Sequence, residues 1–260
     1  MSFSIAEFEA VVEKINNGMD DISAKIDELP GKANAAIDHW YIPGFVADAV
    51  IWMAEQMIDL AGKIWDKLVE FLKGVAAPLY FWNFRSDLQT VVDDANGVVA
   101  NLGDAEMAGS AEWSGIGAEA YRRQISPQRE AAGELAGQAE EMRGSLLELA
   151  LGGLAFYIGV GVIVVKFVAA LVACLVALGS VVFSWAGLAL VVEEAGVNTA
   201  ALAALATGLG ALLTTQLHQM GAMEAALSSD KFPGGVWPKA HSGQFSDGTV
   251  KDGDNDWSLS

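Results

Sequence analysis

The residue types that most often do chemistry are few in this chain of 260 residues, and they stand far apart. Its three histidines are His39, His218 and His241, and its one cysteine is Cys174. A zinc site needs several nitrogen or sulfur ligands at close spacing, and a disulfide within the chain needs two cysteines. We therefore expect neither a metal centre nor an internal disulfide.

Acidic residues are plentiful, but they form no catalytic pattern. Asp252, Asp254 and Asp256 alternate as at the start of a calcium-binding loop, yet Trp257 stands where that loop needs glycine. The chain also has no nucleophile elbow, no His-Glu-x-x-His pair and no phosphate-binding loop. The sequence thus predicts a protein that is not an enzyme, with no metal, cofactor or small-molecule substrate.

The charge is strongly negative and unevenly spread. The chain has 33 acidic and 15 basic residues, a formal charge of −18. Residues 1–148 carry 25 acids and 11 bases, whereas residues 149–223 carry only Lys166, Glu193 and Glu194. Hydrophobic residues make up 53% of the chain, which excludes an intrinsically disordered protein. The acidic balance argues against a nucleic-acid partner, because phosphate binding needs a basic face.

The N-terminal region has the period of a bundle helix. Over residues 5–29, apolar residues alternate at spacings of three and four, the 3.5-residue repeat of a coiled coil. We expect Ser4 to be the N-cap of this helix and Pro30-Gly31 to end it. Its apolar seam either fills the core of a bundle or binds a partner helix, and both interpretations stay open.

Three further amphipathic elements are predicted. A second helix is expected over residues 45–73, followed by an aromatic corner over 78–84. A third helix is expected over 85–109 and a fourth over 116–149. Pro127 lies early in the fourth helix, where it either kinks the helix or marks a later start.

A short motif occupies the turn between the third and fourth predicted helices. Trp113-Ser114-Gly115 is followed by Gly117 and Tyr121, four and eight residues after the tryptophan. Gly115 permits a tight reversal, and the Trp113 ring can cover the end of a helical hairpin. Over about residues 85–148, the chain resembles the WXG family, the helical-hairpin substrates of type VII (ESX) secretion.

The resemblance implies a hairpin shaped by Trp113, Gly115, Gly117 and Tyr121, a helical protein partner or self-association, and export without a signal peptide. With its added regions, the chain looks more like the larger ESX secretion-associated substrates of actinobacteria. The first residues are consistent with such export, since no basic residue precedes Lys14 and no apolar core follows. The family's Tyr-x-x-x-Asp/Glu export signal is missing. Either a partner supplies it, or the protein is not exported by this route.

The last large feature is an apolar block. Residues 149–192 contain one charge, Lys166, and about 20 apolar residues suffice for a helix to span a bilayer. We expect two apolar helices with a break at Gly179-Ser180. Ala169, Ala173 and Ala177 form a ridge of small residues that would pack helices in lipid. A membrane-inserted hairpin is the favoured interpretation; a soluble hairpin masked by the amphipathic helices is the alternative.

Together these patterns predict an all-α protein, an elongated helical bundle with a Trp-x-Gly hairpin and an apolar, membrane-inserting region. Its four segments are an amphipathic region (1–84), the hairpin (85–148), the apolar region (149–227) and a polar acidic tail (228–260). We expect a secretion-associated protein of the cell envelope or medium that binds helical partners and membranes. The alternative is a resident integral membrane scaffold or pore component unrelated to secretion.

Overall fold

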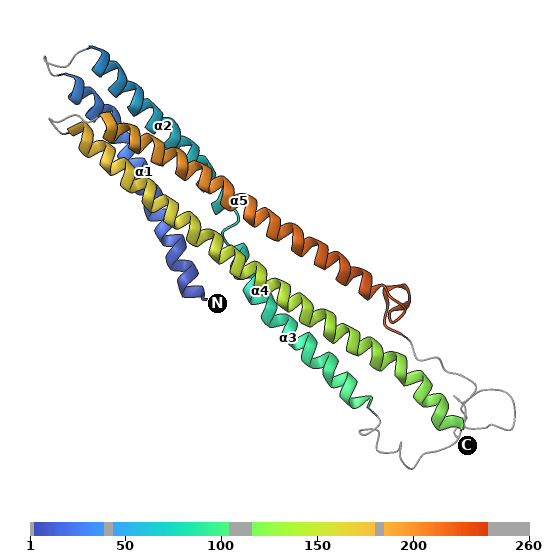
Figure 1. The fold of residues 1–260 in the computed structure, drawn as a ribbon. Helices are drawn as coiled ribbons and strands as arrows, with labels where there is room; N and C mark the ends of the chain where they lie inside the picture. Colours follow the sequence, from blue (N-terminus) through green and yellow to red (C-terminus); the bar gives the residue numbers. More distant parts are fainter. Residues whose placement is uncertain (1–2, 39–43, 104–115, 180–184, 239–260) are drawn as a thin grey trace. The chain divides into compact units, whose positions relative to one another are not determined.

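The computed structural model describes residues 3–38, 44–103, 116–179 and 185–238 (Figure 1). The described residues are helical and contain no strand, which confirms the predicted all-α bundle. The helices are α1 (Ile5–Ile37), α2 (Gly44–Leu72), α3 (Ala77–Asn101), α4 (Ile116–Gly179), α5 (Trp185–Leu227) and the short 3₁₀ helix η1 (Pro233–Gly235).

The beginning of α1 follows the sequence prediction. The Ser4 side chain accepts a hydrogen bond from the Glu7 backbone N–H at 3.3 Å, as an N-cap does. The α2 helix begins and ends within one residue of the predicted range 45–73.

The predicted end of α1 at Pro30-Gly31 is wrong, because the helix continues through Pro30 to Ile37. Proline removes one backbone hydrogen bond from a helix and costs about 3 kcal/mol there. Leu29 on one side of it and Ala33 and Ala36 on the other remain buried in the core. This packing on both sides holds the two parts of α1 in one helix.

The predicted aromatic corner over residues 78–84 is also wrong, because these residues form the first turns of α3. Pro78 is the second residue of that helix, where its missing N–H would have no intrahelical acceptor. The helix ends at Asn101, and the last predicted residues of this helix, 104–109, lie outside the described residues.

The polar and apolar halves of α4 form one continuous helix of 64 residues. It passes through Pro127 and through residue 149, so neither position is a helix boundary. It ends at Gly179, where the sequence predicted a break.

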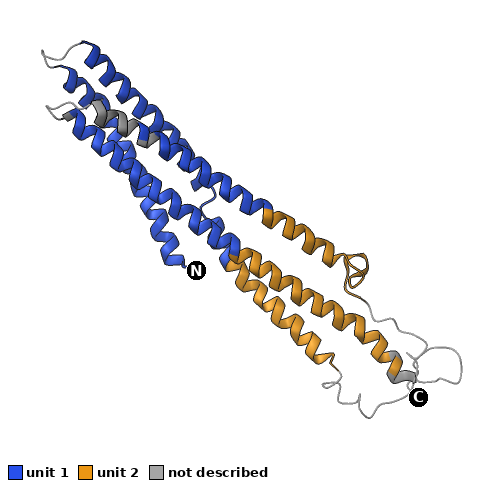
Figure 2. Cartoon of the chain, in the orientation of Figure 1, with its two compact units in different colours: residues 1–82, 148–214 blue, residues 83–147, 215–260 orange. Residues whose placement is uncertain are grey.

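The chain divides into two compact units (Figure 2). Unit 1 contains residues 1–82 and 148–214, and unit 2 contains residues 83–147 and 215–260. The chain passes from one unit to the other within α3, α4 and α5.

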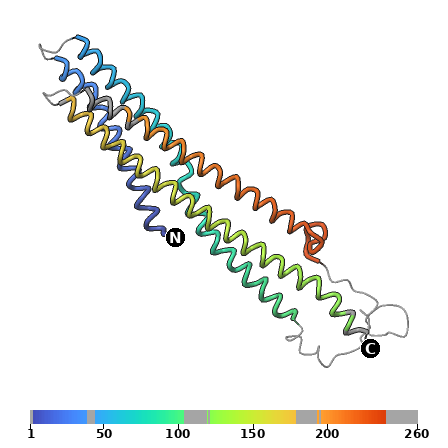
Figure 3. The backbone as a smooth tube through the Cα atoms, in the orientation of Figure 1, coloured from blue at the N-terminus to red at the C-terminus, as the bar shows by residue number. Residues whose placement is uncertain are grey.

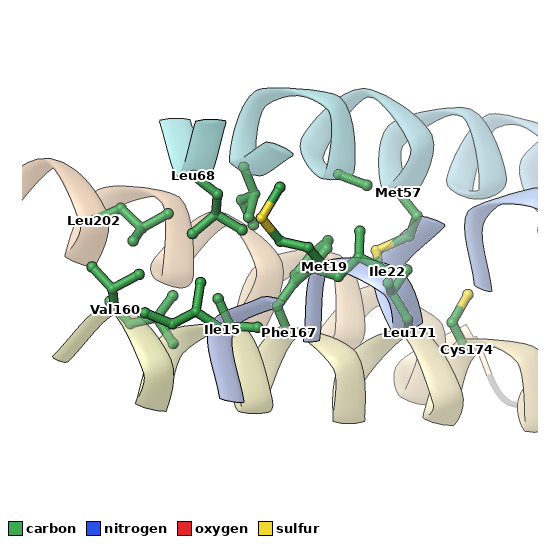
Figure 4. Close-up of a cluster of buried hydrophobic side chains, with 14 of the residues drawn as sticks. Ile15, Met19, Ile22, Met57, Leu68, Val160, Phe167, Leu171, Cys174 and Leu202 are labelled. Carbon is green, nitrogen blue, oxygen red and sulfur yellow. The ribbon is translucent and has the colours of Figure 1, made fainter. Parts of the chain in front are cut away.

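Figure 3 traces the backbone of α1, α2, α4 and α5 through unit 1. All four helices contribute side chains to one hydrophobic core (Figure 4). The largest fully buried side chains in this core are Ile15, Ile22 and Leu29 of α1, Val50, Met57, Ile64 and Leu68 of α2, Phe167 and Leu171 of α4, and Leu202 of α5.

Unit 2 packs through small residues. Its part of α4 buries Ala131, Ala132, Ala136 and Ala139, which lets α3 approach closely. A Cβ on Gly133 would lie 3.9 Å from Cγ2 of Val99. The segment after α5 is joined to α4 by an ion pair of 2.9 Å between Lys231 Nζ and Glu134 Oε2.

This ion pair gives unit 2 a dependence on pH. Hydrogen bonds from Lys231 and then Gln138 hold the pKa of Glu134 below its ordinary value of 4.5. The depressed pKa means that the pair stabilises the folded state above about pH 4.5 and that this contribution is lost as the pH falls through the lowered value. We expect Lys231→Met to raise the Glu134 pKa, measured by carboxyl-carbon NMR titration.

Lys25→Met is the control, because Lys25 pairs only with Glu28 on its own helix in the described structure. It should leave the Glu134 titration unchanged. An unchanged Glu134 pKa in Lys231→Met would show that this pair does not form in solution.

Candidate membrane-associating surface

The apolar half of α4 presents a buried stripe to the rest of unit 1. Val160, Val164, Phe167 and Leu171 are spaced four, three and four residues apart, so they share one helix face, and each is at most 1% exposed. Figure 4 shows several of these side chains against Ile15, Met19 and Ile22 of α1 and Met57 and Leu68 of α2. The two amphipathic helices thus cover this face of the apolar segment.

The crossing of α1 over α4 depends on a glycine. A Cβ at Gly18 would overlap Cγ1 of Val164 and would lie 3.6 Å from its Cβ. Further along α4, a Cβ at Gly161 would meet Ile15 and Val11 at 3.7 and 3.9 Å, an ordinary contact distance. With valine at residue 164, a side chain at residue 18 would require Val164 to rotate or the two helices to move apart.

An aromatic cluster joins α2 to α4 at the other end of the covered stripe. The Phe71 and Phe156 rings meet edge to face at 5.0 Å, and Phe8 meets Tyr157 in the same way at 5.6 Å. The buried Tyr157 hydroxyl donates a hydrogen bond of 2.8 Å to the carbonyl oxygen of Phe71. This bond satisfies the one polar atom that the cluster would otherwise bury unpaired.

On the opposite face of α4, apolar side chains are exposed to solvent. Val162, Val165, Ala169, Val172 and Val176 are all exposed, and their spacings of three and four place them in one row. We call this row the valine stripe. Exposure rises to 66% at Val176. Soluble proteins seldom leave a continuous apolar row uncovered, and such rows mark contacts with partners or membranes.

The α5 helix is still less covered. Within the described chain, segments of α4 and α5 are long and apolar enough to cross a membrane, judged by length and composition. In the most apolar window, half of the α4 residues are buried, compared with 11% in α5. The two apolar segments therefore differ: one is a partly covered core helix, and the other is mainly surface.

The residues predicted to shape the hairpin turn lie largely outside the described structure. Trp113 and Gly115 are outside the described residues, and Gly117 lies in the first turn of α4. Tyr121 is in α4 and is 47% exposed.

The three alanines of the predicted ridge do not share one environment. Ala169 and Ala173 are exposed, whereas Ala177 is half-buried against the core of unit 1. Ala169 belongs to the valine stripe, which sequence reasoning missed. The spacing of that stripe is present in the sequence, but apart from Lys166 the neighbouring residues are apolar too, so no alternation of polar and apolar residues marks the stripe.

No cluster of metal-ligating side chains occurs in the part of the chain that the structure describes. The only thiol, that of Cys174, is buried in the core of unit 1. The chemistry that this surface offers is apolar contact, with one ammonium group, Lys166, exposed within it.

Comparisons of the chain with protein families, with curated proteins and with solved structures give no match.

Proposed function

We propose that this chain is a non-enzymatic helical protein that associates with membranes through the apolar segments of α4 and α5. One observation carries the proposal. The apolar half of α4 is covered on one face by amphipathic helices and bears the exposed valine stripe on the other. Such a helix is held in a water-compatible bundle yet is long and apolar enough to enter lipid.

The energetics favour a covered state in water. Ile15, Ile22 and Leu29 of α1 are fully buried, and exposing each of them costs about 1.5–3 kcal/mol. Separation of α1 from α4 is therefore unfavourable until lipid replaces α1 as the apolar surroundings of α4. In this proposal the valine stripe makes the first contact with lipid, and α1 then separates from α4.

We further propose, from the resemblance of residues 85–148 to the WXG family, that the protein is secretion-associated and binds helical partners. The absence of recognisable catalytic motifs in the sequence supports a binding role. A resident membrane scaffold remains the competing function. Recovery in the culture medium separates the two, because a resident protein stays with carbonate-washed membranes.

The valine stripe can be tested without disturbing the fold. Val172→Asp places a carboxylate on an exposed position, so the melting temperature should change little. In lipid, the same carboxylate costs about 2.5–3.5 kcal/mol on insertion scales. We expect wild-type protein to float with phosphatidylcholine vesicles in a density gradient and Val172→Asp to remain largely unbound.

Val69→Asp is the matched control, since Val69 of α2 is 41% exposed and Val172 is 40% exposed. It should float like the wild type. Recovery of the wild type entirely in the unbound fraction would refute membrane association. An equal loss of flotation in both variants would refute the role of the valine stripe in lipid contact.

A disulfide tests whether α1 must leave α4. The Cβ of residue 18 would lie 3.6 Å from the Cβ of Val164, close to the mean of about 3.8 Å in disulfides. We expect the double variant Gly18→Cys, Val164→Cys, made with Cys174→Ala, to float when reduced and to stay unbound when oxidised. Addition of a reductant should restore flotation.

The single variant Val164→Cys, in the same Cys174→Ala background and with the same oxidant, controls for oxidation and should float throughout. If the oxidised double variant floats as well as the reduced one, the protein binds lipid without releasing α1.

The secretion proposal has its own test. Trp113→Ala removes the ring expected to close the hairpin, and we expect it to lower the amount of protein in the medium of cells with a working type VII apparatus. Wild-type protein should be absent from the medium when that apparatus is disabled. Equal amounts in the medium in all three cases would exclude this route.

A further inference from the structure

An apolar groove runs between α4 and α5 of unit 1, separate from the face covered by α1. Its lining is entirely apolar and contains small residues on both helices, among them Gly152, Ala155 and Gly159 of α4 and Ala201, Ala204 and Gly208 of α5. Its volume is about 680 Å³. The groove extends over residues 152–163 and 201–212, which at 1.5 Å per residue is about 17 Å.

The two helices are antiparallel along this groove, and two contacts give their register. A Cβ on Gly152 would overlap Cδ2 of Leu212, and a Cβ on Gly159 would lie 2.8 Å from Cδ1 of Leu205. A step of seven residues forward on α4 thus corresponds to seven residues backward on α5. The next step in this register pairs Lys166 with Asn198, two turns beyond Gly159 and Leu205.

Both of these residues are polar, and both continue the stripes that line the groove. Seven residues are about two helical turns, so Lys166 shares the face of Gly159 and Asn198 shares the face of Leu205. Lys166 is exposed, and no ion pair engages it in the described part of the chain. Two acids of α5 precede Asn198: Glu193, five residues away, is on a different side of the helix, and Glu194 is one turn away.

The Asn198 amide is an unexplained polar group in an apolar setting. Asn198 is 3% exposed, and its Nδ2 has no hydrogen-bond partner among the described residues. A buried donor without a partner costs about 1–3 kcal/mol, so such a group is expected to serve a ligand, water or ion. By this register, Asn198 and Lys166 both stand just beyond one end of the groove, three residues past its lining residues Ala201 and Ile163.

We propose that this groove binds a long-chain fatty acid, with its carboxylate held by Lys166 and Asn198. The side chains that line the groove are apolar, so they offer no hydrogen bonds to the backbone of an extended peptide. A hydrocarbon chain needs no hydrogen bonds and is therefore favoured. The hydrocarbon core of a bilayer is about 30 Å thick, so one acyl chain spans about 15 Å, close to the length of the groove. The ammonium and the amide complement the single negative charge at the end of such a chain.

The proposal is independent of membrane association, because it is tested in buffer without vesicles. Isothermal titration of the full chain with myristate, below the concentration at which it forms micelles, should show saturable binding of one molecule. Myristyl alcohol has the same chain without the carboxylate, and we expect it to bind about tenfold more weakly. Octanoate has the carboxylate but fills only part of the groove, and it should bind more weakly still.

Variants assign the two ends of the site. Lys166→Met retains the aliphatic stem and should weaken myristate binding about tenfold while leaving binding of the alcohol unchanged. Asn198→Leu should weaken the binding of myristate. It should not lower the melting temperature, since it removes an unpaired buried amide. Lys63→Met, at an exposed lysine of α2, is the control for charge and should have no effect.

Ala204→Phe fills the groove from an exposed position and should abolish binding of both probes. Ala155→Leu is the second variant if Ala204→Phe fails to fold, and Ala169→Phe, exposed but outside the groove, is the control. The proposal is overturned if myristate does not bind or if the alcohol binds as tightly as myristate. It is also overturned if Lys166→Met binds myristate like the wild type, or if both groove-filling variants do.

Discussion

Unit 1 depends on how closely α1 approaches the apolar half of α4. Because Gly18 has no side chain, Val164 occupies the space that a Cβ would take, and the two helices interdigitate there. Protein interiors are packed to crystal density, so a wider crossing would leave voids beside Ile15 and Phe167 that the remaining helices could not fill. One face of α4 is dry for this reason. Among the described residues of unit 1, the opposite face has no comparable partner, and it bears the valine stripe.

The charged residues are also distributed differently between the covering helices and the apolar half of α4. Acidic residues crowd the outer faces of α1 and α2, whereas the apolar half of α4 has only Lys166. A net charge far from zero keeps a protein with uncovered apolar rows soluble, because copies repel one another. The same charge repels an anionic lipid surface within a Debye length of about 8–10 Å, so uncharged headgroups and moderate salt favour approach to a bilayer.

The sequence predicted helices well wherever polar and apolar residues alternate with the helical period. The α2 helix and the start of α1 follow their patterns to within a residue because one face of each is polar. In residues 149–179 nearly every residue is apolar, so no period distinguishes the buried row through Val164 from the exposed row through Val172. That distinction arises only when α1 and α2 are in place.

Only part of the candidate site could be predicted from the sequence. Lys166 was conspicuous as a lone charge, but the groove beside it depends on the register of α4 against α5, which local sequence does not specify. Asn198 stands in the sequence as an ordinary polar residue, and its burial is a tertiary property. The hairpin residues Trp113 and Gly115 lie outside the described residues, so their role stays a prediction.

Pro30 inside α1 has a consequence for the proposed release of this helix from α4. Residues 31–37 lie beyond the missing hydrogen bond at Pro30. Their fully buried side chains are the small Ala33 and Ala36, and Ile37 is only partly buried against the core. Segments with few buried contacts open with the smallest free energies, well below that of global unfolding. In that release we expect α1 to open first at its C-terminal turn and then toward Leu29 and Ile22. Because the larger contacts break last and one at a time, the helix can peel away through a series of small barriers instead of one large barrier.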